Sequence, residues 1–104
     1  INNFIFVRAD RKMVKISFSE INHIESFSDY IKIHLNEKVV VTRETISSIE
    51  AKLPAAYFLR IHRSFIVSIS KIESFTNEFI EVRKKALPIS RSYKKDVLAR
   101  LENV

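Results

Sequence analysis

The sequence predicts a mainly β domain with two helices. Apolar and polar residues alternate along most of the chain, which is typical of strands with one buried face. Two segments, about 45–53 and 91–100, instead space their apolar residues three and four apart, as helices do. A length of 104 residues, of which 46% are hydrophobic, fits one domain with a buried core. We therefore expect a single domain over residues 1–104.

Five strands are expected in the first half of the chain. Apolar residues recur near every second position in the segments 4–8, 13–18, 23–27, 30–35 and 38–42. A turn at residues 9–12 and a hairpin about Asn36 and Glu37 connect neighbouring strands, and residues 19–22 form a short helical turn. The chain contains no glycine, so its turns must rely on Asn, Asp and charged residues.

The mid-chain helix is expected from Thr45 to Leu53. Ile46, Ile49 and Leu53 fall on one helical face. The hydroxyl of Thr45 can accept a hydrogen bond from a backbone N–H of the first turn. Pro54 ends the helix, because the residue before a proline avoids the helical region. We interpret this helix as a structural lid over the sheet.

Five further strands and a last helix follow. The strands are expected at residues 58–62, 65–67, 72–75, 79–82 and 86–89. Pro88 places the last strand at a sheet edge, because proline has no N–H to donate to a neighbour. Ser90 is expected to cap a helix that ends near Arg100. The buried face of this helix is made of Tyr93, Val97 and Leu98 or Leu101. The phenylalanines assigned to the core are Phe4, Phe6, Phe18, Phe58, Phe65 and Phe75.

The positive charge of the chain lies mainly in its second half. Residues 1–56 hold eight Lys or Arg and seven Asp or Glu, a balance of +1. Residues 57–104 hold ten and five, a balance of +5 in a total of +6. A basic half suggests a polyanionic partner such as DNA, RNA or a membrane surface. A basic surface without any partner explains the charge equally well.

A few features of the sequence bear on where the protein is located. No apolar run approaches the roughly 20 residues of a membrane span, and no signal peptide is visible. The chain has no cysteine, which excludes disulfides and thiolate metal sites. It begins with Ile1 rather than Met, so we expect a piece of a longer protein. The cytoplasm is the default location expected for it.

An enzyme active site is not expected. Without glycine the chain has no phosphate-cradling loop, and no serine lies in a nucleophile-elbow context. No metal or cofactor is predicted, because the histidines are far apart in the sequence and none pairs with another ligand at helical spacing. The histidines are His23, His34 and His62. The remaining candidate carboxylate pairs lie on hairpins, where carboxylates are usually solvated: Glu25 with Asp29, and Glu73 with Glu78.

Two short segments favour nucleic-acid binding. Residues 60–65 and 87–95 each place cationic side chains beside small hydroxyls and apolar anchors, with few acids nearby. Arginine presents a planar fork of donors, and serine can donate to a phosphate oxygen. These side chains therefore suit contact with a phosphate backbone and with base edges.

The same segments resemble the motifs of LytTR DNA-binding domains. Residues 58–67 resemble the F-x-R-x-H-R-S-F-x-V core of that family. Residues 72–74 and 87–95 are similar to its I-E-S and L-P-V-S-R-x-Y segments. Upstream, residues 21–26 resemble its I-x-x-I-E-A segment, and residues 30–34 resemble its Y-V-x-I-H strand. The matches occur in order, with compatible spacing, over essentially the whole chain.

The resemblance implies an elongated domain of several small antiparallel sheets with a helix on one side. It also implies sequence-specific binding of duplex DNA, in which loops rather than a recognition helix enter successive major grooves. The family consists of bacterial transcription regulators, usually the output domains of two-component response regulators. Its members form homodimers on DNA through an N-terminal receiver domain, which lies outside this sequence. Their targets are promoter direct repeats or paired half-sites.

Three loops carry the base contacts that the resemblance implies. Arg63 follows the R-x-H strand, and Arg91 lies just past the last strand. Each guanidinium suits bidentate contact with guanine O6 and N7, worth about 1–3 kcal/mol of discrimination. The third loop surrounds Ser28, Asp29 and Tyr30. Asp29 either accepts from cytosine N4 or stabilises its own turn. In the second case Tyr30 or Lys32 takes the contact.

The two arginines have different alternatives. Arg63 is also compatible with an ordinary surface ion pair at a strand end. Arg91 lies in the first turn of a helix, where the helix dipole disfavours a cation. That unfavourable position favours a functional reason for Arg91.

Phosphate contacts are predicted around these loops. The residues are Arg60, His62, Ser64, Ser90, Ser92, Lys94, Lys95 and Lys32. His62 is equally compatible with a structural role, and the serines with capping or turning the chain. Lys94 and Lys95 also fit an exposed helix face that binds nothing.

Two other functions compete with duplex DNA binding. A single-stranded nucleic-acid or RNA-binding β module would need exposed aromatic side chains beside Arg and Lys on one sheet face. A basic protein-interaction domain would need only an acidic partner.

Overall fold

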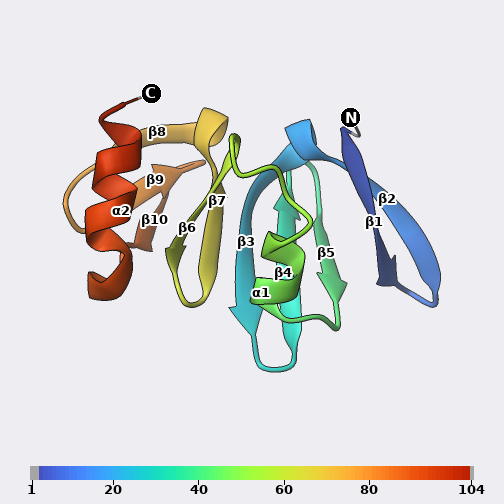
Figure 1. The fold of residues 1–104 in the computed structure, drawn as a ribbon. Coiled ribbons are helices and arrows are strands. Elements are labelled where there is room, and N and C mark those ends of the chain that lie inside the picture. Colours follow the sequence, from blue (N-terminus) through green and yellow to red (C-terminus); the bar gives the residue numbers. More distant parts are fainter. Residues whose placement is uncertain (1–2, 104) are drawn as a thin grey trace.

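The computed structural model describes residues 3–103 and consists of small antiparallel sheets arranged in a row (Figure 1). The strands are β1 (Phe4–Ala9), β2 (Lys12–Ser17), β3 (Ile21–Phe27), β4 (Tyr30–Leu35), β5 (Val39–Thr42), β6 (Phe58–His62), β7 (Phe65–Ser68), β8 (Ile72–Phe75), β9 (Phe79–Val82) and β10 (Lys85–Pro88). The helices are α1 (Ile46–Glu50) and α2 (Arg91–Leu101), with short 3-10 turns at Phe18–Glu20 and Ile69–Lys71. The expected mainly β fold with two helices is confirmed.

The sheets follow the order of the chain. β1 and β2 form a hairpin, and the central five-stranded sheet has the order β5-β4-β3-β7-β6. The third sheet has the order β10-β9-β8, which puts Pro88 on an edge strand as expected. The molecule measures 40 × 30 × 24 Å, so the expected elongated shape is also confirmed.

Strand β7 joins two hydrophobic cores, because successive side chains of a strand point to opposite faces. Ile66 packs into the first core with Ile24 of β3 and Ile49 of α1. Val67 packs into the second core with Ile80 of β9 and Val97 of α2. Figure 1 shows α1 in front of the central sheet and α2 beside the third sheet. The interpretation of the mid-chain helix as a lid over the sheet therefore agrees with its packing.

Several turns adopt positive φ without glycine. Asp10 and Arg11 between β1 and β2 have φ of 52° and 63°, and Arg83 and Lys84 between β9 and β10 have 51° and 64°. Two-residue hairpin turns of the mirror-image type require positive φ at both positions, and non-glycine residues are disfavoured there by roughly 1–2 kcal/mol each. A side chain from a neighbouring strand supports the second turn. The backbone N–H of Lys84 donates to Oε1 of Glu73 at 2.8 Å.

The mid-chain helix is shorter than predicted, whereas the last helix, predicted at about 91–100, has nearly the predicted bounds. The Thr45 hydroxyl accepts from the N–H of Ser48 at 3.0 Å, which confirms the predicted cap. However, α1 ends at Glu50, because Leu53 N–H bonds back only three residues, to the Glu50 carbonyl, before Pro54. Ser90 precedes α2, but its hydroxyl makes no capping hydrogen bond, so that detail of the prediction was wrong.

Two phenylalanines assigned to the core are on the surface. Phe6 is 50% exposed, because its face of the β1–β2 hairpin has no further layer to pack against. Phe75 is 43% exposed, since it ends β8 at the edge of the third sheet. In neither case does the sequence show which face of the strand is covered, because Phe6 is flanked by the apolar Ile5 and Val7, and Phe75 ends its strand. Within residues 3–103, neither helix has the length and apolar character needed to cross a bilayer.

Candidate nucleic-acid interface

Three predicted DNA-contacting segments lie along one edge of the molecule, at the bottom of Figure 1. They are the β3–β4 turn (27–30), the β6–β7 turn (62–64) and the start of α2 (90–95), and we call them together the turn edge. β3 and β6 both pair antiparallel with β7, so they run in the same direction and end at the same edge. The N–H of Ser90 donates to the Ile61 carbonyl at 3.0 Å, which holds the start of α2 beside the end of β6.

Arg63 and Arg91 are exposed on this edge. Within the described residues, neither guanidinium forms an ion pair. The surface ion pair considered for Arg63 is therefore not formed. Unpaired guanidinium groups on a shared edge keep all their donors free for a ligand.

Arg60 lies beneath the β6–β7 turn. Its Nε donates to the His62 carbonyl at 2.7 Å, and one terminal nitrogen donates to the Arg63 carbonyl at 2.7 Å. The other terminal nitrogen pairs with Oε1 of Glu50 at 2.7 Å, and the side chain is only 11% exposed. The guanidinium also lies over the ring of Tyr93, 5.6 Å from its centre. All three nitrogens of Arg60 are thus engaged inside the protein.

His62 and Ser64 complete the support of this turn. The N–H of Ser64 donates to Nδ1 of His62 at 3.0 Å. The ring therefore accepts at Nδ1, and in its neutral form carries its proton on Nε2. Burial, and then the neighbouring charges of Arg63 and Arg60, lower the pKa of His62. The Ser64 carbonyl accepts from the N–H of Ser26, which fastens the turn to β3.

The β3–β4 turn is built differently. Ser28 has a φ of 54°, and Asp29 is exposed. Phe27 is 56% and Tyr30 40% exposed. Lys32 Nζ lies 4.5 Å from the centre of the Phe27 ring. This turn therefore presents aromatic surface with a cation beside it.

Arg43 is a candidate that the sequence reasoning missed. It lies in the loop between β5 and α1, is exposed, and its guanidinium is 5.9 Å from the centre of the Tyr30 ring. It borders a shallow hollow of about 410 Å³ together with Ser28 and Asp29. The sequence did show an arginine, Arg43, in the loop just before the predicted helix cap at Thr45.

The first turn of α2 carries no acidic residue. Lys95 is exposed and Lys94 is half-buried. The hydroxyls of Ser90 and Ser92 lie 3.4 Å apart. Free backbone N–H groups, hydroxyls and cations together form a surface suited to anions.

An elongated β domain with unpaired arginines, lysines and hydroxyls gathered on one edge belongs to the class of nucleic-acid-binding domains. Comparison with known proteins gives the family. The sequence model of the LytTr DNA-binding domain matches residues 11–102, so the chain belongs to the LytTR family of DNA-binding domains. This family is a class of DNA-binding domains of regulators, not an enzyme class.

Several curated proteins are similar in sequence. The sensory transduction protein LytT of Enterococcus faecalis is 35% identical over 77 residues, covering 68% of this chain and 32% of that protein. The sensory transduction protein LytR of Staphylococcus epidermidis is 29% identical, covering 85% and 41%. The transcriptional regulatory protein YpdB of Escherichia coli K12 is 29% identical, covering 91% and 42%. The chain thus spans about a third to two fifths of the length of these relatives.

A solved structure has the same fold. A LytTr DNA-binding domain from Bacillus cereus superposes with a TM-score of 0.80, covering 99% of both chains at 20% identity. The match covers both helices and all three sheets described above.

Proposed function

We propose that this domain binds duplex DNA sequence-specifically by inserting the turn edge into successive major grooves. The observation that carries the proposal is the exposure of Arg63 and Arg91 on one edge without ion pairs. Each guanidinium reads guanine through O6 and N7, worth about 1–3 kcal/mol of discrimination. The longest dimension of the molecule is 40 Å, which limits the length of the turn edge. One turn of duplex DNA measures about 34–36 Å, so an edge of this length fits contact with two successive openings of the major groove.

The β3–β4 turn makes the third contact. Asp29 accepts from cytosine N4 or supports its own turn, and Tyr30 adds contact surface. Arg43, beside Tyr30, offsets the repulsion between Asp29 and the phosphates. Lys32, which flanks Phe27, contacts the backbone.

Phosphate contacts surround these base contacts. His62 donates from Nε2, because its Nδ1 already accepts from Ser64. The hydroxyls and lysines at the start of α2 hold the adjoining phosphates: Ser90, Ser92, Lys94 and Lys95. Ser64 contributes its hydroxyl from the β6–β7 turn. Arg60, whose nitrogens are engaged, supports DNA binding by shaping that turn rather than by touching a phosphate.

We further propose that residues 1–104 are the output domain of a bacterial response regulator. The relatives carry names of sensory transduction and transcriptional regulatory proteins, and all of them are longer than this chain. In this proposal a receiver domain outside the sequence brings two copies together on direct repeats or paired half-sites. The protein then acts in the cytoplasm, where bacterial DNA lies.

Single-stranded nucleic-acid binding is a second candidate, favoured by one observation. Phe27 and Tyr30 are exposed next to Lys32 and Arg43, which is the arrangement that stacks unpaired bases. Two aromatic residues at one turn make a small platform, whereas the arginines extend along the whole turn edge. Duplex binding therefore has the broader support.

Selection of bound duplexes from a random pool tests the first proposal. We expect an enriched motif with guanines at a fixed spacing, and the same motif as duplex should outcompete either of its single strands. A preference for the single strands would favour the second candidate. Recovery of no motif would overturn sequence-specific binding.

A further inference from the structure

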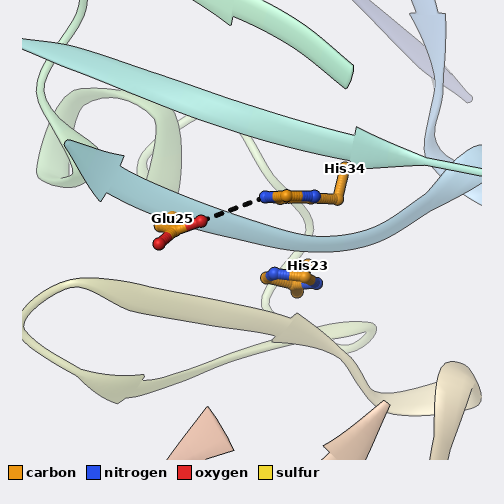
Figure 2. Close-up of side chains that lie close together, drawn as sticks. All are labelled: His23, Glu25 and His34. Atoms are coloured by element: carbon orange, nitrogen blue, oxygen red, sulfur yellow. Dashed lines mark hydrogen bonds and ion pairs between the residues drawn. The ribbon is translucent and has the colours of Figure 1, made fainter. Parts of the chain in front are cut away.

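A cluster of three potential ligands lies on the face of the central sheet opposite α1. β3 and β4 pair so that His23 is directly opposite His34, while Glu25 lies two residues further along β3. Side chains two residues apart on a strand lie on the same face of the sheet, and so do those of residues directly opposite each other on paired strands. The side chains of His23, Glu25 and His34 therefore all lie on one face. Figure 2 shows Glu25 and His34 joined by a hydrogen bond, with the His23 ring beneath.

His23 is buried without any hydrogen bond. It is 4% exposed, and neither ring nitrogen has a partner among the described residues. A neutral imidazole has one N–H donor and one acceptor, and leaving such groups unsatisfied in the interior is destabilising by about 1–3 kcal/mol. The ring instead stacks on His34, with centroids 4.1 Å apart and planes 11° from parallel. Buried polar groups without a partner are rare in folded proteins, and a bound ion is one species that would satisfy this one.

We propose that His23, Glu25 and His34 bind a zinc ion. One ligand atom from each residue lies within 4.8 Å of the others. Nε2 of His34 is 3.1 Å from Oε1 of Glu25, close to the roughly 3.3 Å that separates two ligand atoms of a tetrahedral zinc ion. The neutral His34 ring has a single proton. On zinc binding this proton moves from Nε2 to Nδ1, and bonds from Nε2 and Oε1 to the ion replace the hydrogen bond between His34 and Glu25. The parallel His23 ring turns about its χ2 axis to direct one nitrogen at the ion.

The surroundings favour neutral imidazoles, the form that binds metals. Burial, then the charges of His34 and Lys85, lower the pKa of His23 to about 4. Burial lowers the pKa of His34 as well, against the opposing effect of its hydrogen bond to Glu25. Glu25 and His34 keep 26% and 22% of their side-chain surface exposed, which leaves an entry path and room for a water as fourth ligand. Lys85 and Lys32 lie nearby and weaken the binding of any cation.

The choice of zinc follows from the donor set. Two imidazoles and one carboxylate suit zinc, whereas calcium and magnesium prefer oxygen ligands. The chain contains three histidines and no cysteine, so no thiolate site competes. A zinc ion here would fasten β4 to β3 two residues before Phe27, where the β3–β4 turn begins.

Thermal unfolding of the untagged 104-residue chain with zinc chloride tests the proposal. We expect zinc at about 100 times its dissociation constant to raise the unfolding midpoint by on the order of 10 °C, reversibly on chelation. Glu25→Gln and His34→Gln, at positions about a quarter exposed, should each weaken zinc binding by at least about 10-fold, since even partners outside the ligand shell change affinity by about 10–100-fold. Lys85→Gln should strengthen it.

The matched control is His62→Gln, which removes the one histidine outside the cluster and should leave zinc affinity unchanged. Cobalt(II) absorption provides a readout that does not depend on stability, and its tetrahedral spectrum should vanish in Glu25→Gln and His34→Gln. No midpoint shift with zinc would overturn the proposal. Equal affinity in the cluster variants, or abolished binding in His62→Gln, would overturn it as well.

Discussion

The β6–β7 turn and the β3–β4 turn lie on the same edge but are stabilised in opposite ways. The first is tied by Arg60 to the His62 and Arg63 carbonyls, by Ser64 N–H to His62, and by Ser26 N–H to the Ser64 carbonyl. In the second, no side-chain hydrogen bond within the described chain involves residues 27–30, and cations only lie over the rings of Phe27 and Tyr30. Side-chain hydrogen bonds therefore hold the first turn, whereas among the described residues none holds the second.

This difference bears on specificity. A turn whose backbone is held in its binding conformation loses less conformational entropy on association, so the contacts made from it contribute more fully to affinity. Under the proposed function, we therefore expect Arg63, on the tied turn, to contribute most to discrimination between bases. We expect Asp29 and Tyr30, on the other turn, to make interactions that tolerate several sequences.

Removal of the two exposed arginines is expected to have the largest effect. Arg63→Ala and Arg91→Ala should each reduce affinity for the selected duplex by about 1–3 kcal/mol, or roughly 5- to 150-fold, because alanine cannot form the bidentate hydrogen bonds to guanine. Binding to random duplex should fall much less. Electrophoretic mobility shifts with both duplexes measure this, with Arg8→Ala on β1 as a charge-matched control. Unchanged sequence preference after both substitutions would refute base reading.

Arg60→Lys separates a shaping role from a phosphate contact, because it keeps the charge. Lysine cannot reproduce three donors in a fixed plane, so the His62 and Arg63 carbonyls lose partners. We expect unfolding free energy to fall by about 1–3 kcal/mol and preference for the selected duplex to fall several-fold. The salt dependence of binding should stay the same. A reduced salt slope with full sequence preference would instead make Arg60 a phosphate ligand.

The lysines of α2 lie beside the tied turn but are expected to read no bases. Lys94→Ala and Lys95→Ala should weaken binding to all duplexes alike. Each substitution that removes an ammonium group from a phosphate should reduce the slope of log affinity against log salt by about 0.9. The exposed Lys95 is expected to show the larger change. Titrations at several salt concentrations measure the slopes, and a slope equal to that of the parent would remove the residue from the interface.

Local patterns in the sequence were sufficient for most of the fold. Alternation predicted β4 and β6 to the residue, and the Thr45 cap follows from its position before Ile46. What failed depends on covering layers or on hydrogen-bond geometry. Phe6 lies in the apolar run of residues 4–7, on the face of its hairpin that no further layer covers. Ser90 stands at the cap position with its hydroxyl turned to Ser92.

Interactions between distant segments could not be read from the sequence. Arg60 was predicted beside DNA, yet its partners come from α1, α2 and its own turn. His23 and His34 are 11 positions apart, and only the register of β3 with β4 makes them neighbours. Helical spacing between ligands gives no sign of such a cross-strand pair. The strands predicted at 23–27 and 30–35 would have suggested it if they had been paired as a hairpin and their register counted outward from Ser28 and Asp29.

A pair of glycine substitutions offers the smallest but most direct comparison of the turns. Ser28 holds a φ of 54°, where glycine is free of the steric penalty that serine meets, so Ser28→Gly should raise the unfolding free energy by about 0.5–1 kcal/mol. Ser64 is not among the residues with positive φ, so Ser64→Gly should lower the unfolding free energy by a similar amount through the greater entropy of the unfolded chain. Urea unfolding measures both. Equal changes of the same sign would mean that the backbone of the two turns is not constrained in these different ways.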